Sequence, residues 1–139
     1  MKISTKGRYA LRMMIDLAEH NDGSFISLKD IAARQNISKK YLEQIIPILN
    51  HAGLLATVRG HQGGYRLAKA PAAYTVGEIL RATEGSTAPV ACLEGTVNDC
   101  PRKGFCKTLP IWQGLQDVID NYLDGITLAE LVEAEKSTK

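Results

Sequence analysis

Residues 27–49 read SLKDIAARQNISKKYLEQIIPIL and contain two helix starts separated by a tight turn. Ser27, followed three residues later by Asp30, fits a capping box, so we expect a short helix that ends near residues 35–36. Ser38 can cap a second helix whose apolar side chains fall on one face. Those side chains are Leu42, Ile45, Ile46 and Leu49. Two short helices around a tight turn predict a helix-turn-helix.

The segments around this stretch predict a winged-helix order. Residues 7–20 place small and apolar side chains on one helical face and indicate a first helix. Residues 55–59 and 65–67 predict two short strands on either side of the glycine-rich segment 60–64. We therefore expect a mainly α fold with a small β-hairpin wing.

The C-terminal half predicts a long loop and a long helix. A capping box at Thr75 indicates a fourth helix that Gly85 ends, and residues 108–123 predict the longest helix. The loop between them is too long to be an idle connection in a compact domain. The expected parts are a winged-helix domain at residues 1–85, a cysteine-bearing loop at 86–107, and a dimerisation helix with a short C-terminal helix at 108–139.

Length and composition are those of one soluble globular domain. The chain has 139 residues, of which 45% are hydrophobic and 23% are charged. The N-terminus lacks the apolar core of a signal peptide and no apolar run could span a bilayer, so we expect a cytoplasmic protein with no membrane partner. An odd number of cysteines in a reducing compartment argues against a disulfide framework and favours metal or redox chemistry.

Charge is distributed unevenly along the chain. Residues 1–70 carry 11 Lys and Arg against 5 Asp and Glu, whereas residues 71–139 carry 6 against 10. A basic N-terminal half suits a polyanion, because each phosphate neutralised by Lys or Arg releases condensed counterions. A chance asymmetry on a solvated surface would give the same counts.

The second helix of the helix-turn-helix and the wing are the candidate DNA-contacting surfaces. Lysine suits guanine or phosphate, glutamine pairs with adenine, and a carboxylate among lysines favours base reading over non-specific coating. A bare glycine backbone can approach DNA closely, and an arginine suits a narrow minor groove. The predicted contact residues are Ser38, Lys39, Lys40, Tyr41, Glu43, Gln44, Arg59, Gly60, Gly63 and Gly64. A solvated helix face followed by a simple glycine turn is the alternative.

Three cysteines in the spacing Cys92-x7-Cys100-x5-Cys106 lie on the predicted loop. Three soft ligands without a neighbouring histidine favour an iron-sulfur cluster or a thiolate-rich zinc site. Three unrelated thiols packed as small apolar residues are the alternative. No base accompanies the cysteines, so we expect no enzyme activity.

The longest predicted helix carries an apolar stripe that indicates a homodimer. The stripe consists of Trp112, Leu115, Ile119 and Tyr122. Few residues remain in the chain to cover it, and Gly114 would permit close approach of another backbone. A two-fold dimer would present two reading heads to a pseudo-palindromic operator. Packing of the stripe on its own domain is the alternative.

The sequence resembles the Rrf-type winged-helix transcription regulators, and within them the iron-sulfur cluster branch. The matching runs are residues 2–12, 41–44, 52–54, 58–60, 63–65 and 126–131. The resemblance implies that Lys40, Glu43, Gln44 and Arg59 read the operator. It also implies an iron-sulfur cluster on the three cysteines, with 2Fe–2S favoured over 4Fe–4S, and control of cluster-biogenesis genes.

The fourth cluster ligand is not given by the resemblance. Related branches use a histidine or a partner-subunit aspartate, but the matching positions here are Leu109 and Arg8, which cannot bind iron. Glu94, Asp99, a residue of the other subunit or a solvent-derived ligand stay open. Other regulators in the family leave two alternatives: a cysteine-metabolism repressor that answers to a protein effector, and a nitric-oxide or redox-responsive repressor. A zinc-thiolate winged-helix protein is the third.

Overall fold

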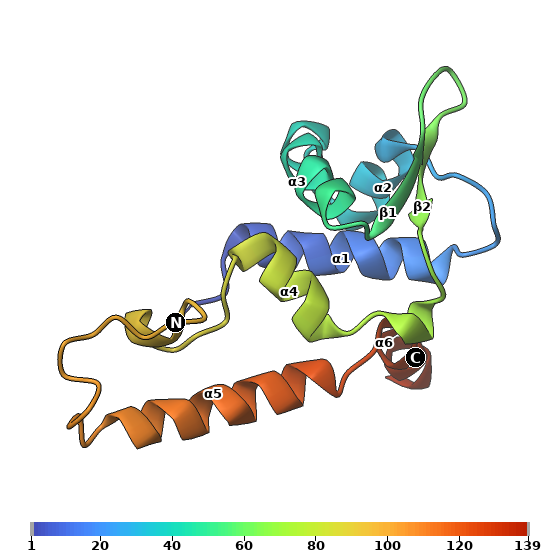
Figure 1. Cartoon of the computed structure of the whole chain (residues 1–139). Helices are drawn as coiled ribbons and strands as arrows, with labels where there is room; N and C mark the ends of the chain where they lie inside the picture. Colours follow the sequence, from blue (N-terminus) through green and yellow to red (C-terminus); the bar gives the residue numbers. More distant parts are fainter. Residues whose placement is uncertain (1, 139) are drawn as a thin grey trace.

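The computed structural model describes the backbone of residues 2–138 and the side chains of residues 2–134. The outer limits of the predicted parts, residues 1 and 139, lie outside this range. The helices are α1 (Thr5–Glu19), α2 (Leu28–Gln35), α3 (Lys39–His51), α4 (Val76–Glu84), α5 (Leu109–Asp124) and α6 (Leu128–Thr138) (Figure 1). The strands are β1 (Leu55–Val58) and β2 (Gly64–Leu67). The predicted mainly α fold with a hairpin wing is confirmed.

Side-chain caps set the helix starts that the sequence predicted. Ser27 Oγ accepts a hydrogen bond from Asp30 N at 3.2 Å, and Ser38 Oγ accepts one from Tyr41 N at 3.0 Å. Thr75 caps α4 in the same way. Each cap satisfies a backbone donor that the first helical turn leaves free.

The first helix begins two residues earlier than predicted. Ser4 is its N-cap, because its Oγ accepts from Gly7 N at 3.1 Å. Ser4 N and Oγ also donate to Glu84 Oε1 at the end of α4. The start of α1 is therefore tied to the residue that precedes the loop before α5.

The core lies where α1 crosses α2, α3 and α4. Its fully buried side chains come from each of these helices and include Met13, Ile31, Leu42, Leu49 and Ile79. Leu128 of α6 also reaches this core. The wing is an antiparallel pair in which Leu55 faces Leu67 and Val58 faces Gly64.

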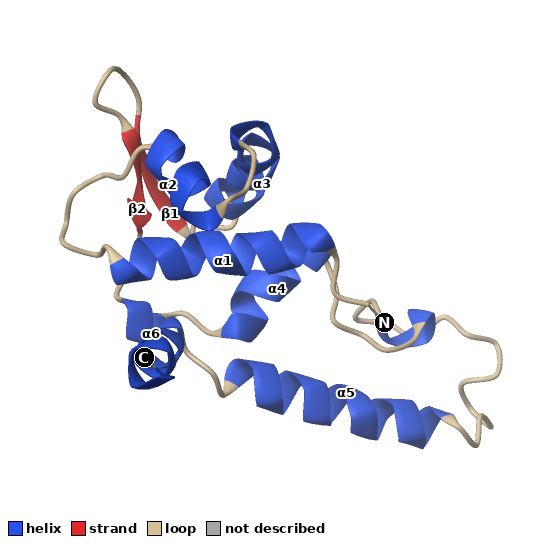
Figure 2. Cartoon of the chain, turned by 180° about the vertical axis from the view of Figure 1, so that it is seen from behind, coloured by secondary structure: helices blue, strands red, loops and turns tan. Residues whose placement is uncertain are grey.

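Helix α5 stands apart from this core. Both views draw it as a separate rod that joins the head near α4 and α6 (Figures 1 and 2). None of its residues is fully buried. Two short 3-10 turns, Pro71–Ala73 and Ala91–Leu93, were not predicted. No helix among the described residues is long and apolar enough to cross a membrane.

Candidate nucleic-acid interface and cysteine loop

Helix α3 presents a polar, long-armed face to solvent. Lys39, Lys40, Glu43 and Gln44 are exposed. The opposite face, with Leu42 and Ile45, is fully buried. The 3.6-residue period separates the two faces, so the predicted reading residues project together from one side of the helix.

Two of the predicted contact residues hold α3 in place. Ser38 uses its hydroxyl as the N-cap of the helix. Tyr41 is half-buried, and its ring packs edge-on against Tyr9 of α1 with 5.2 Å between centroids. The Arg12 guanidinium lies 5.2 Å from the centre of the Tyr9 ring. The amino end of α3 is thereby fixed to the first helix.

A hollow of about 470 Å³ lies between α3 and the wing. Its polar lining brings together side chains from both elements, and Thr57 Oγ1 donates to Asn50 Oδ1 across it at 3.0 Å. Lys39, Glu43, Asn50, Thr57, Arg59, Gly60, Gly63 and Gly64 are among the lining residues. Six of the predicted contact residues therefore share one surface.

The wing is docked by a close backbone approach. Ile26 and Tyr65 exchange two backbone hydrogen bonds, at 2.8 and 2.9 Å. Gly64 lies buried beside this bridge, and a Cβ there would overlap the Ile26 carbonyl. Gly60 has φ +113°, a conformation that favours glycine. Gly64 serves the docking of the wing, while Gly60 serves its turn.

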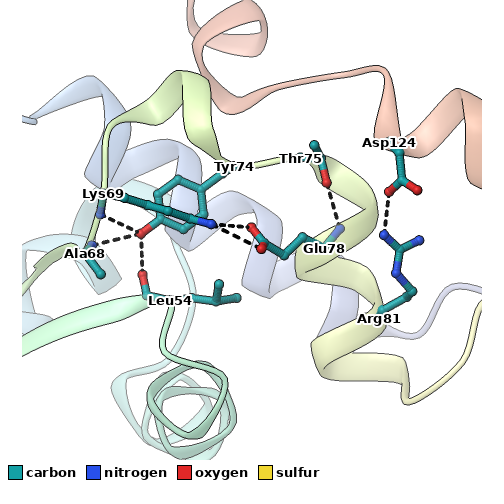
Figure 3. Close-up of polar contacts among 8 residues, drawn as sticks. All are labelled: Leu54, Ala68, Lys69, Tyr74, Thr75, Glu78, Arg81 and Asp124. Atoms are coloured by element: carbon teal, nitrogen blue, oxygen red, sulfur yellow. Dashed lines mark hydrogen bonds and ion pairs between the residues drawn. The ribbon is translucent and has the colours of Figure 1, made fainter.

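Tyr74 anchors the root of the wing. Its hydroxyl donates to the Leu54 carbonyl at 2.6 Å and accepts from Ala68 N and Lys69 N at 2.8 and 3.2 Å (Figure 3). The ring is fully buried. Lys69 Nζ lies over that ring and pairs with Glu78 of α4. Tyr74 thus joins the start of β1 to the chain leaving β2.

A buried carboxylate connects α1 to the helix-turn-helix. Asp16 is 1% exposed and accepts from Arg34 Nη2 at 2.7 Å, Arg34 Nε at 3.0 Å and Gln35 Nε2 at 3.0 Å. The Asp16 hydrogen bond raises the pKa of Arg34, so the guanidinium stays charged. His20 Nδ1 contacts the Asp16 carbonyl oxygen at 2.8 Å. The end of α2 is held at two positions.

The cysteine loop brings two of its three thiols to one place. Cys92, Asp99 and Cys100 line a hollow of about 420 Å³, whereas Cys106 lines a separate one with Phe105. In the part of the chain that the structure describes, no three His, Cys, Asp or Glu side chains are grouped to hold a metal. By chemistry the donors suit a cluster or zinc, but their described positions do not converge.

Cys106 is the thiol with a perturbed proton affinity. Its Sγ lies 3.3 Å from Thr108 Oγ1, and this hydrogen bond, followed by the Thr108 and Leu109 amides, lowers the pKa of the thiol. Donors aimed at sulfur favour the thiolate, which is the form that binds metals and reacts with electrophiles.

The exposed ridge of α5 overlaps only in part with the predicted dimer stripe. Leu115 and Tyr122 are exposed, whereas Trp112 and Ile119 are half-buried within the chain. Ile111 and Val118 complete the exposed ridge. The side chains at 111, 115, 118 and 122 follow the spacing of one helical face.

Sequence reasoning missed two residues that position the site, Asp16 and Tyr74. An acidic residue between the apolar residues Ile15 and Leu17 of the first helix was a signal that could have identified Asp16. Tyr74 carried no comparable signal, because its three partners lie at the two ends of the wing.

Comparisons with known proteins agree with this architecture. Residues 3–134 match the Rrf2 family model, described as an iron-dependent transcriptional regulator. The regulator CymR of Bacillus subtilis is 43% identical over 94% of this chain and 89% of its own length. IscR of Vibrio vulnificus is 41% identical over 95% of this chain and 77% of its own.

Solved structures give the same two likenesses. The structure of CymR, the global cysteine regulator of B. subtilis, superposes with a TM-score of 0.78, 40% identity, and coverage of 96% of this chain and 98% of its own. T. potens IscR gives a TM-score of 0.78 at 40% identity, covering 100% of this chain and 91% of its own.

Proposed function

The chain belongs to the Rrf2 family of winged-helix transcription regulators, and from that premise we propose that it is a homodimeric regulator whose operator binding responds to an iron-sulfur cluster. Regulators of this family bind DNA and are not enzymes. We propose further that the protein acts in the cytoplasm and controls genes of cluster biogenesis.

The observation that carries the DNA-reading part is the shared hollow between α3 and the wing. Lys39 and Glu43 on one wall and Arg59 on the other belong to elements that suit a major groove and the neighbouring minor groove. Lys40 and Gln44 are exposed on the same helix but do not line the hollow, whereas Ser38 caps the helix and Tyr41 packs against Tyr9. We assign base reading to Lys40, Glu43 and Gln44 and backbone contact to Gly60 and Gly63, because Gly64 is buried against Ile26.

The dimer part of the proposal rests on α5. Four large apolar side chains on one face of this helix are exposed in the single chain, and Tyr122 is 69% exposed. A Cβ on Gly114 would meet nothing within 4 Å, so the space beside it is open to a second backbone. A second copy would cover Leu115 and Tyr122 and bring Trp112 and Ile119 to the edge of the interface.

The cluster part rests on the donor set. Cys92, Cys100 and Cys106 supply three thiolates on one loop, and Asp99 supplies a carboxylate beside two of them. Asp99 is therefore our candidate for the fourth protein ligand, in preference to Glu94. A 2Fe–2S cluster would supply a removable, redox-sensitive group. Binding it on all three cysteines requires the loop to bring Cys106 toward Cys92 and Cys100.

A cysteine-responsive repressor is the second candidate, and a specific finding favours it. CymR of B. subtilis is as similar to this chain as the IscR proteins are. In that case the protein would carry no cluster and would respond through a protein effector. Two further candidates would use the same three cysteines. One is a winged-helix protein with a zinc-thiolate site, and the other is a nitric-oxide or redox-responsive repressor.

Anaerobic purification separates these candidates. Iron, acid-labile sulfide and zinc are measured in the wild type and in Cys92→Ala. The wild type should be coloured and contain iron and sulfide, and the variant should lose both. A colourless protein containing zinc would replace the cluster with a zinc site. A metal-free wild type that binds its operator fully would favour the cysteine-responsive candidate.

The DNA-reading part has its own test. Selection from a randomised duplex pool should enrich a pseudo-palindrome, and Arg59→Ala should weaken binding to it by about tenfold or more. Lys69→Ala is the matched control, since it removes one positive charge outside the hollow. Equal losses in the two variants would contradict a specific role for the wing.

A further inference from the structure

Helix α5 makes polar contacts with the DNA-reading head near its carboxyl end. Arg81 of α4 pairs with Asp124 at 2.5 Å and with Asp120 at 3.7 Å. Figure 3 shows the Arg81 side chain reaching from α4 to Asp124. A Cβ at Gly77 would overlap Asp124, so the glycine leaves room for this pair.

Asp120 receives a further contact from the beginning of the cysteine loop. Thr87 Oγ1 donates to Asp120 Oδ1 at 3.1 Å, and Thr87 is only 4% exposed. The same Oδ1 atom is the one nearest to Arg81. Gln116 Nε2 donates to the other carboxylate oxygen at 3.0 Å. One carboxylate therefore links the loop, α4 and α5.

We propose that Asp120 is a positioning residue that sets the angle of α5 to the reading head according to the state of the cysteine loop. The inference rests on the proposed function, in which α5 pairs with its copy and so fixes the separation of the two heads. Because Thr87 and Arg81 share Oδ1 of Asp120, displacement of Thr87 leaves that oxygen to Arg81 alone. A changed angle at α5 alters which half-site spacing the dimer fits.

The remaining contacts of α5 explain why a single carboxylate can have this effect. The helix has no fully buried residue that would fix its rotation. Besides the Arg81 pairs, the turn that follows α5 is bonded to the start of α4 and the residue before it. There Val76 N donates to Ile126 O at 2.9 Å and Leu128 N to Tyr74 O at 3.2 Å. We take these bonds as a pivot, and Asp120 lies about one helical turn before Asp124, where α5 ends.

The matched variants are Thr87→Val, which removes only the hydroxyl, and Thr87→Ser, which keeps it. Binding is measured on duplexes that carry the selected half-sites at the preferred spacing and at spacings one base pair shorter or longer. Thr87→Val and Asp120→Ala should each reduce the discrimination between spacings about fivefold, the scale of one lost hydrogen bond. Thr87→Ser should keep the wild-type ratio. The control Glu78→Gln weakens the ion pair of α4 with Lys69, not with α5, and should also keep it.

Coupling and folding are checked in the same assay. The double variant Thr87→Val/Asp120→Ala should discriminate between spacings no worse than Asp120→Ala alone, because each single change already removes the same Thr87–Asp120 hydrogen bond. Affinity for an isolated half-site should stay at the wild-type value in every variant. Unchanged discrimination in Thr87→Val and Asp120→Ala, or an equal loss at every spacing and at the half-site, would overturn the inference.

A second measurement needs no DNA and no dimer. Noncanonical spin labels at Gln62 in the wing and Gln113 on α5, with unlabelled protein in excess, report the distance between the head and α5 within one chain. Thr87→Val should broaden this distance distribution, and Thr87→Ser should not. Identical distributions would overturn the positioning role even if no operator were found, whereas a broadened distribution without DNA selection would contradict only the proposed function.

Discussion

Arg34 of α2 forms a two-pronged contact with the buried carboxylate of Asp16 on α1, through its Nε and Nη2 atoms. This contact joins the scaffold helix to the helix-turn-helix, and Gln35 adds a third donor to the same group. The orientation of α2, and through the tight turn that of α3, therefore depends on a polar bond inside an otherwise apolar core.

Removal of the Asp16 carboxylate should destabilise the fold strongly. Asp16→Ala leaves Arg34 and Gln35 without their acceptor, and we expect a loss of about 3 kcal/mol in the free energy of unfolding, measured by urea denaturation followed by circular dichroism. Arg34 is partly exposed, so solvent limits its share of this loss. Asp30→Ala, an exposed acidic residue on α2, is the control and should cost less than 1 kcal/mol. Similar costs for both variants would contradict the role of the buried contact.

Tyr74→Phe should loosen the root of the wing. The change leaves the Leu54 carbonyl and the Ala68 and Lys69 amides without their shared hydroxyl, at a cost of about 2 kcal/mol. Faster hydrogen exchange at residues 54–56 and 66–69 should accompany the loss. Tyr65→Phe is the control, because no hydrogen bond of its side chain contributes to the wing root. Unchanged hydrogen exchange in Tyr74→Phe would show that the pairing of the two strands is stable without the Tyr74 hydroxyl.

Lys39 and Gln44 should affect DNA binding in different ways. Gln44→Ala should relax the base preference at one operator position by about 1–3 kcal/mol, because a glutamine reads the base edge. Lys39→Ala should weaken binding to all sequences alike and reduce the salt-dependence slope by about 1, because we assign Lys39 a phosphate contact. Both are measured by fluorescence anisotropy over a salt series and a set of singly mutated operators. A change in base preference in Lys39→Ala alone would reverse the two assignments.

The exposed face of α5 can be tested with two valines of equal exposure. Val118 on α5 and Val97 on the cysteine loop are each 65% exposed in the single chain. Val118→Glu should dissociate the dimer in sedimentation experiments, because it places a charge in the centre of an apolar interface, and should leave the circular dichroism spectrum unchanged. Val97→Glu should stay dimeric. A dimeric Val118→Glu protein would rule out this face as the interface.

Local rules explain the parts of the fold that could be predicted. Ser27, Ser38 and Thr75 each accept from an amide three residues later, so the residues that define these helix starts are close in sequence. Ser4 obeys the same rule, but the apolar pattern indicated a helix only from residue 7 and did not identify this cap. Element order followed from such signals together with the period of the apolar residues.

The contacts that the sequence could not predict are long-range and polar. Arg81 and Asp120 lie on separate helices, and nothing in the spacing of charges between residues 81 and 124 indicates which of them meet. The exposed face of α5 was predicted only in part for a related reason. Spacing grouped Trp112 with Tyr122, but Trp112 is half-buried in the folded chain and Tyr122 is exposed, a difference that depends on the tertiary fold.

Cys106 should react with iodoacetamide at a lower pH than an ordinary thiol in metal-free, reduced protein. The Thr108 hydroxyl is the largest cause of its lowered pKa, so Thr108→Val should move the midpoint of alkylation upward, toward the ordinary value of 9.0, without abolishing the shift that the backbone amides supply. The sign for stability follows from the same shift. Because the folded pKa lies below the unfolded one, the thiolate stabilises the fold above the unfolded pKa, and this contribution is lost as the pH falls through the lowered pKa.

Mass spectrometry of each cysteine over a pH series measures this effect, and Thr108→Ser is the matched control because it keeps the hydroxyl. Retention of the low midpoint in Thr108→Ser and its rise in Thr108→Val would assign the shift to the hydroxyl. Equal midpoints in Thr108→Val and the wild type would leave the amides of residues 108 and 109 as its cause. Since metals and electrophiles both bind the thiolate, Cys106 should then be the loop cysteine that reacts first when the loop is open.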